Sequence, residues 1–232
     1  MRFLFIQILL TSFLISSGIL RTDGRIIINE NNEKVILKGF GLGGWLVLEG
    51  YMWNFPGFGS TTTMENAVID LLGEQKADLF FERYRSNYIT EKDISFLAEN
   101  GFNALRIPLH YKHFSPSFNE FTDIGFDLLE PIINACRDND MYVVLDMHAA
   151  PGAQNTSDFS DSDEQEARLF TQYSNQKWYV STWRYIAERY ANEPVVAAYD
   201  LLNEPVLPWG YGPPALRNLY EWAIDSIRMV DP

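Results

Sequence analysis

Residues 195–205 read VVAAYDLLNEP, a near-continuous apolar run that ends abruptly in Asn203, Glu204 and Pro205. An apolar run of this length followed by polar residues is typical of a buried strand. The runs at 34–40, 102–109 and 142–147 have the same character, and helical spacing follows each of them. Buried strands that alternate with helices predict a parallel sheet covered by helices.

The connecting segments supply the helices. The spacing of apolar residues predicts helices over 64–72, 75–88, 91–100, 127–139, 177–190 and 216–230. Gly101 is a stop signal, and Pro131 is expected in the first turn of its helix. The residues before the sheet form a predicted hairpin, with strands at 25–29 and 34–40, and the loop 148–163 is polar.

The glycines between Gly39 and Gly44 do not predict a nucleotide fold, because a Trp-rich loop follows them instead of the N-terminus of a helix. A (β/α)8 barrel places its chemistry at the carboxyl ends of its strands. Polar residues gather at those positions here, which favours the barrel: Glu49, Arg106, His110, Asp146, His148, Asn203 and Glu204.

The 232 residues carry a net charge of −13, and this acidity limits the partners. Nucleic acids, acidic polysaccharides and anionic membrane surfaces would be repelled, so a neutral substrate fits better. The single cysteine, Cys136, lies in a helical pattern and is expected to be a buried small hydrophobe.

The first 18 residues are typical of a secretory signal. Arg2 supplies positive charge, residues 3–15 are mainly apolar, and Ser16, Ser17 and Gly18 are small residues suited to cleavage. A membrane anchor is the alternative, but the apolar stretch is shorter than the roughly 20 residues of a spanning helix. We therefore expect residues 19–232 to be exported and soluble, at the cell surface or outside the cell.

Four motifs occur in order at the ends of successive strands: 43–49 (GGWLVLE), 106–108 (RIP), 146–148 (DMH) and 203–205 (NEP). Together they resemble glycoside hydrolase family 5, over roughly Val35 to Pro232. The loops at 48–51 and 148–155 are most similar to the exo-β-1,3-glucanase branch. The resemblance implies a TIM barrel, and a hydrolase that cleaves a neutral β-glucan by a retaining double displacement without a cofactor.

The resemblance also implies roles for four residues. Glu204 would be the general acid and base, since a carboxyl in a partly dry cleft has a raised pKa and can protonate the leaving oxygen. Asn203 would bond the sugar 2-hydroxyl. Arg106 would hold and ionise the second carboxylate, and His148 would position the substrate or that carboxylate.

Other loop residues are candidate sugar contacts. Glu49, Tyr51 and Asn155 resemble the branch's contacts around the terminal sugar, and surface loop roles are their alternative. Trp209 and Tyr211 follow Glu204 in a loop rich in Pro and Gly, where their rings could stack on sugars. Asn155 also begins a glycosylation sequon, although a glycan there would obstruct the cleft.

Neither metal nor calcium binding is expected. His110 and His113 lack a third ligand. An acidic loop lacks the Gly and final Glu of a calcium loop, which favours a solvated charge run: Asp158, Asp161, Asp163, Glu164 and Glu166. Trp178 and Trp183 are expected in the core.

The sequence departs from the family in one respect. The retaining mechanism needs a second carboxylate about 5 Å from the acid, in this family a glutamate that ends the seventh strand. After Glu204 the carboxylates are Glu221, Asp225 and Asp231, and none ends a strand. We therefore expect residues 19–232 to be the N-terminal half of a barrel, with strands 1 to 4 only, inactive alone and without its nucleophile.

The function then belongs to the full-length parent, which is expected to be a monomer. The sequence does not distinguish cleavage of β-1,3 from cleavage of β-1,4 linkages, or exo from endo action. An inactive carbohydrate-binding or scaffold protein on the same fold is the alternative from another class. A metal-dependent barrel hydrolase is a third possibility.

Overall fold

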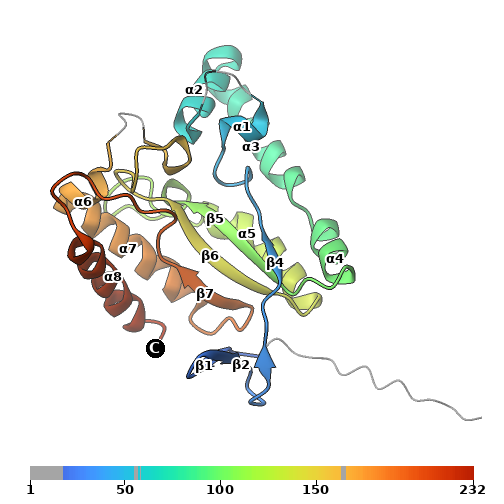
Figure 1. Ribbon diagram of the computed structural model, residues 1–232. Helices are drawn as coiled ribbons and strands as arrows, with labels where there is room; N and C mark the ends of the chain where they lie inside the picture. Colours follow the sequence, from blue (N-terminus) through green and yellow to red (C-terminus); the bar gives the residue numbers. More distant parts are fainter. Residues whose placement is uncertain (1–17, 55–56, 58, 163–165) are drawn as a thin grey trace, which may run out of the picture.

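The computed structural model describes residues 18–54, 57, 59–162 and 166–232, and a four-stranded parallel sheet lies at its centre (Figure 1). The strands β4 (Gly39–Gly41), β5 (Ala104–His110), β6 (Tyr142–Ala149) and β7 (Val196–Asp200) are neighbours in chain order. Each pair is parallel, as the apolar runs predict. The predicted signal lies, except for Gly18, outside the described residues.

A small antiparallel sheet precedes the parallel one. It contains β1 (Arg21–Asp23), β2 (Ile26–Ile28) and β3 (Lys34–Val35), and the pairing of β2 with β3 confirms the predicted hairpin. The single strand predicted over 34–40 is divided between the two sheets as β3 and β4. The sequence did not indicate β1, because its three exposed residues carry no apolar pattern.

The helices connect and cover the parallel sheet. The six predicted helices are present, and short ones join them: α1 (Gly50–Trp53), α2 (Thr61–Leu72), α3 (Glu74–Tyr88), α4 (Glu91–Glu99), η1 (Tyr111–His113), α5 (Ile124–Asp138), η2 (Asp158–Ser160), α6 (Arg168–Thr171), α7 (Tyr173–Tyr190) and α8 (Pro213–Arg228). None of the helices formed by the described residues has the length and apolar character that a membrane crossing requires.

Pro131 lies in the middle of α5, so its predicted place in the first turn was wrong. The helix begins at Ile124, three residues earlier than predicted, because Phe126 on that first turn is part of the buried core. Proline has no N–H, so the carbonyl of Asp127 loses its usual partner in the helix. Burial of the apolar face, which includes Leu129 and Ile133, compensates for the missing bond.

Gly101 ends α4 as predicted. Its φ of +82° lies in the left-handed region, which glycine adopts without steric cost. The amide of Gly101 donates to the carbonyl of Ala98 at 2.9 Å, and the amide of Phe102 donates to that of Leu97 at 3.1 Å. This pair of bonds is a Schellman motif, and it turns the chain from α4 directly into β5.

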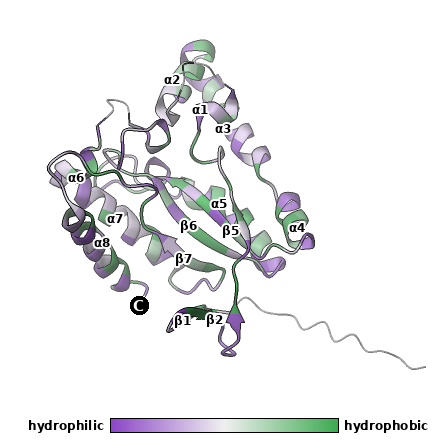
Figure 2. Ribbon diagram, in the orientation of Figure 1, coloured by the Kyte–Doolittle hydropathy of each residue, from purple (hydrophilic) through white to green (hydrophobic). Residues whose placement is uncertain are grey.

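The two faces of the parallel sheet differ. Side chains that alternate along β5 and β6 are at most 1 % exposed and pack against the helices: Leu105, Ile107, Leu109, Val143, Leu145 and Met147. Figure 2 shows these hydrophobic strands beside the helices. The intervening residues lie on the other face, where Arg106 and Val144 are half-buried and Asp146 and His148 are buried. That second face carries the polar residues.

The end of β7 is fixed by α7. The Trp183 indole donates to the carbonyl of Leu201 at 3.0 Å, and the Tyr179 hydroxyl donates to the same oxygen at 2.8 Å. Trp183 is fully buried, as predicted for the core, whereas Trp178 is half-buried and donates to the hydroxyl of Ser115.

Cys136 provides a test of this core. It is buried in α5, and burial raises the pKa of its thiol to about 12. The thiolate is the reactive form, so we expect Cys136 to react with Ellman's reagent at about pH 8 on the order of a hundredfold or more slowly than in denaturant. Equal rates before and after denaturation would contradict the burial of α5.

Candidate active site

Polar side chains collect on the open face of the parallel sheet. Asp146 on β6 lies in register with Pro108 on β5 and Asp200 on β7. Paired residues of parallel strands point to the same face, and Arg106 is two residues before Pro108 on that face. The strands therefore bring one cation and two carboxylates together near their carboxyl ends.

A closed ring of contacts, the polar ring, joins the side chains of Arg106, Asp146, His148 and Asn203. Nη2 of Arg106 lies 3.0 Å from Oδ2 of Asp146 and donates to Oδ1 of Asn203 at 2.9 Å. Nδ1 of His148 lies 2.6 Å from the same Oδ2 of Asp146. Nδ2 of Asn203 lies 3.4 Å from Nε2 of His148 and closes the ring. Three residues predicted as substrate contacts are thus brought together.

The ring determines the tautomer of His148. Because Asp146 accepts from Nδ1, the proton of the neutral imidazole lies on Nδ1, and Nε2 is an acceptor that faces the Asn203 amide. Asn203 in turn must direct its carbonyl oxygen to Arg106 and its NH2 group to His148. One hydrogen of that NH2 group remains for another acceptor.

Asp146 is the buried member of the ring. Burial raises the pKa of its carboxyl, while the hydrogen bond from His148 and the charge of Arg106 act in the opposite direction. Within the described part of the chain, its Oδ1 atom is buried without a hydrogen-bond partner. The carboxylate therefore depends on the two contacts at Oδ2.

Asp200 is a site residue that sequence reasoning missed. Its Oδ2 accepts from Nε of Arg106 at 3.0 Å and from Nη2 at 2.9 Å. We expected Arg106 to hold a carboxylate from outside the chain, but the structure shows it held by Asp200 and Asp146. A charged residue inside the apolar run 195–202 was the signal available, because such a residue needs a partner.

The backbone at Glu204 has an uncommon conformation. Its φ is +42°, in a region that costs about 1–3 kcal/mol for a residue other than glycine. Nδ2 of Asn155 donates to the Glu204 carbonyl at 2.9 Å, and the Val206 amide donates to the Gln154 carbonyl at 3.0 Å. These two bonds hold the turn that presents Glu204.

Gln154 is a second missed residue, and it is fully buried. Its Nε2 donates to the carbonyls of His148 at 2.6 Å and Asn203 at 3.0 Å, and its Oε1 accepts from the Ala150 amide at 3.2 Å. It therefore joins the end of β6 to the segment after β7. The polar loop 148–163 gave no sign of this, since Asn203, the partner that joins the two segments, lies 49 residues away in sequence.

Asn155 was predicted as a sugar contact, but its side chain is buried and directed elsewhere. Besides donating to Glu204, it accepts from the Ser157 amide at 2.8 Å. In this structure Asn155 supports the Glu204 backbone, and its buried amide is not accessible to a glycan.

The other predicted residues lie outside the ring. Glu204 is exposed, so the described residues do not provide the dry surroundings that we expected for it. Tyr51 is 79 % exposed and Trp209 fully exposed, and Tyr211 is also exposed. The negative charge of Glu49, followed by burial and a hydrogen bond to Glu49, raises the pKa of Tyr51, which places these two side chains together.

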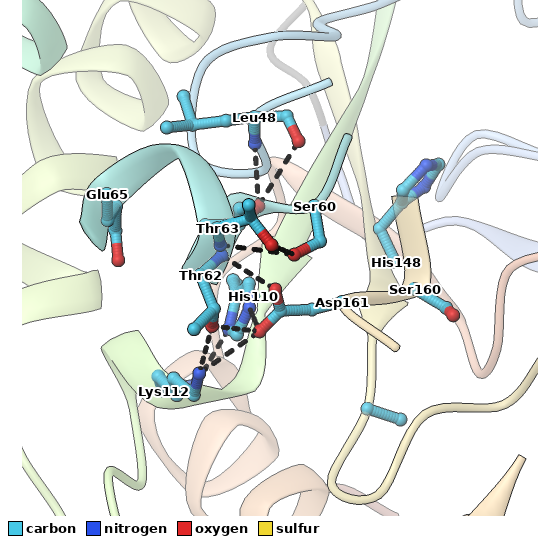
Figure 3. A network of polar contacts seen from close by, with 12 residues as sticks. Leu48, Ser60, Thr62, Thr63, Glu65, His110, Lys112, His148, Ser160 and Asp161 are labelled. Carbon is cyan, nitrogen blue, oxygen red and sulfur yellow. Dashed lines mark hydrogen bonds and ion pairs between the residues drawn. The ribbon is translucent and has the colours of Figure 1, made fainter. Parts of the chain in front are cut away.

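The prediction of a solvated acidic run is wrong for Asp161, because its side chain is only 3 % exposed. It contacts Thr62, His110 and Lys112 (Figure 3). Burial by itself would raise the pKa of this carboxyl, but the hydrogen bond from His110 and the charge of Lys112 outweigh burial and hold the pKa well below its usual range. Asp158 and Glu166 are exposed as predicted, and Asp163 and Glu164 lie outside the described residues.

His110 and His113 each contact another group of the protein. In the parts of the chain that the structure describes, no group of three or more His, Cys, Asp or Glu side chains could hold a metal ion. His110 contacts Asp161, and Nε2 of His113 lies 3.2 Å from the Leu46 carbonyl. Burial, followed by the charges of Arg85 and His110, lowers the pKa of His113 well below its usual value.

A parallel sheet with helices on one face and a polar cluster at its carboxyl end matches part of an α/β barrel. The crystal structure of an endogalactoceramidase has this fold: the likeness covers 92 % of this chain and 50 % of that chain, with a TM-score of 0.67 and 20 % identity. The chain belongs to glycosyl hydrolase family 5, since the Cellulase (glycosyl hydrolase family 5) model matches residues 63–232.

Two curated relatives are similar to this chain over most of its length. A beta-xylosidase of Phanerodontia chrysosporium is 32 % identical over 92 % of this chain and 44 % of its own length. A probable glucan 1,3-beta-glucosidase A of Neosartorya fischeri is 33 % identical over 85 % of this chain and 48 % of its own. The resemblance to the exo-β-1,3-glucanase branch is thus confirmed, and the chain spans about half the length of these relatives.

The pKa of Asp161 gives a pH test. A carboxyl whose folded pKa lies below the unfolded value of about 3.9 contributes stability above that value and loses it as the pH falls. We expect D161N to lower the free energy of unfolding of the protein by about 1.5–3 kcal/mol near neutral pH. Urea unfolding should show this difference constant above about pH 5 and shrinking below about pH 4. A difference that grows on acidification would contradict the ionised, bonded Asp161.

Proposed function

We propose that the whole protein is a secreted, retaining glycoside hydrolase that cleaves a neutral β-glucan. The observation that carries the proposal is Glu204 on a strained turn directly after Asn203, a member of the polar ring. Family membership supports hydrolysis of glycosides, and a relative named as a glucan 1,3-beta-glucosidase supports the glucan. The net charge of −13 favours a neutral substrate.

In this proposal Glu204 protonates the departing glycosidic oxygen and later removes a proton from water. Asn203 uses the remaining hydrogen of its NH2 group to bond the sugar 2-hydroxyl, because its other groups face Arg106 and His148. That hydrogen bond strengthens in the transition state, which makes the orientation of Asn203 part of catalysis.

The second carboxylate of a retaining mechanism is proposed to come from a part of the whole protein that these 232 residues do not include. Glu221 and Asp225 lie on α8, and Asp231 follows this helix, so none of them is at a strand end. The four parallel strands would be half of the eight in a complete barrel. The length of the relatives, about twice the matched region, supports this proposal.

Mutation of Glu204 tests the proposal in the full-length protein. We expect E204Q to lower turnover of laminarin by about 100-fold or more, because the leaving sugar needs a proton. On an aryl β-glucoside with a very good leaving group, the first step should be largely spared. Azide should then accelerate the second step and give a glycosyl azide of retained configuration.

The matched control is E221Q, which changes an exposed glutamate of α8 and should leave turnover unchanged. Full activity of E204Q, or an inverted product by NMR, would remove Glu204 from the role. Sugar binding without turnover by the native protein would favour instead an inactive carbohydrate-binding protein. The exposed rings of Tyr51 and Trp209 would then contact the sugar.

A further inference from the structure

Three loops at the carboxyl end of the sheet meet at the carboxylate of Asp161 (Figure 3). Oδ1 accepts from the Thr62 amide at 2.7 Å, at the N-terminus of α2. Oδ2 accepts from the Thr62 hydroxyl at 2.6 Å, from Nε2 of His110 at 3.0 Å and from Nζ of Lys112 at 3.0 Å, both near the end of β5. Asp161 itself follows β6, so one buried group joins all three loops.

The hydrogen bonds around Asp161 are mutually consistent. Nδ1 of His110 accepts from the Lys112 amide at 3.2 Å, so Nε2 carries the proton that is donated to Asp161. The Thr62 hydroxyl donates to Asp161 and accepts from Nζ of Lys112 at 2.6 Å. A network in which each donor has an acceptor fixes its members rigidly.

One branch of the network leads to Glu49 and Tyr51. Thr61, next to Thr62, accepts from the Leu48 amide at 2.9 Å and donates to the Leu48 carbonyl at 3.3 Å through one hydroxyl. Leu48 directly precedes Glu49, and Tyr51 lies on the short helix α1 that Glu49 begins. The position of Asp161 therefore sets the position of this segment.

The other branch leads to His148 and Glu204. The ring of Phe159, two residues before Asp161, lies against that of His148 with the centroids 5.7 Å apart. The Ser160 hydroxyl donates to the Asn155 carbonyl at 2.9 Å, and Asn155 holds the Glu204 backbone. The loop between β6 and Asp161 is thus attached to the catalytic end of the sheet.

We propose that Asp161 is a positioning residue that sets the segment with Glu49 and Tyr51 at its distance from His148 and Glu204, and so determines sugar affinity. This inference rests on the proposed function. Gln154 bonds the Asn203 carbonyl and the Val206 amide, and so holds the turn at Glu204 without a bond to Asp161. Loss of Asp161 therefore affects binding of the sugar more than the bond-breaking step.

The test uses the full-length protein and kinetics on an aryl β-glucoside. We expect D161N to raise KM by about 10-fold and change kcat less than about 3-fold, since misplacing a segment of the site by about 1 Å can cost up to about 100-fold. Hydrogen exchange should become faster in residues 48–54 and 59–62 and in residues 155–161 together. E166Q is the matched control, because Glu166 is an exposed carboxylate five residues after Asp161 that pairs with Arg168.

T62V is a second variant, which removes one hydroxyl from the network and leaves the backbone bond to Asp161. It should give a smaller rise in KM in the same direction. A native KM in D161N, exchange that is faster in only one of the two segments, or an equal effect of E166Q would overturn the proposal.

Failure of the proposed function can be distinguished from failure of the positioning role of Asp161. If the native protein hydrolyses no glycoside, the reaction assignment fails, and calorimetric titration with laminaritriose then tests Asp161. Affinity about 10-fold weaker in D161N supports the positioning role. Equal affinity, or no binding by the native protein, overturns it.

Discussion

Burying the carboxylate of Asp146 is tolerable only because Arg106 and His148 contact it, since an isolated charge in the interior costs several kcal/mol. The two partners come from neighbouring strands and satisfy the same oxygen. Asn203 is then held between them, one residue before Glu204. The charge of Asp146 thereby fixes the ends of β5, β6 and β7 relative to one another. The orientation of each side chain in the polar ring follows from it.

The sequence predicted the polar residues that end apolar runs, and it missed those whose role depends on a partner far away in the chain. Arg106, His148, Asn203 and Glu204 could be found because each stands at or near the end of an apolar run. Asp161 could not, because clustered charges usually indicate solvent, and its partner Thr62 is 99 residues away. Burial of a charge is decided by such distant partners.

The same distinction holds for the fold. Gly101 was sufficient to end α4, because a left-handed residue is a local requirement. Pro131 misled the prediction of α5, because the packing of that helix on the sheet outweighs one missing hydrogen bond. Gln154 and Asp200 were missed for the same reason as Asp161, since the partners that give them a role are on other segments.

The left-handed turn at Glu204 has a consequence for the order in which the chain folds. The turn is unfavourable by itself, and the groups that hold it, Gln154 and Asn155, are separated from it by about fifty residues of chain. Closing so long a loop is costly before other contacts exist, so the apolar faces of β5 and β6 must assemble first. The turn at Glu204 is therefore expected to be the last part of the site to acquire its native geometry, and the first to lose it in local opening.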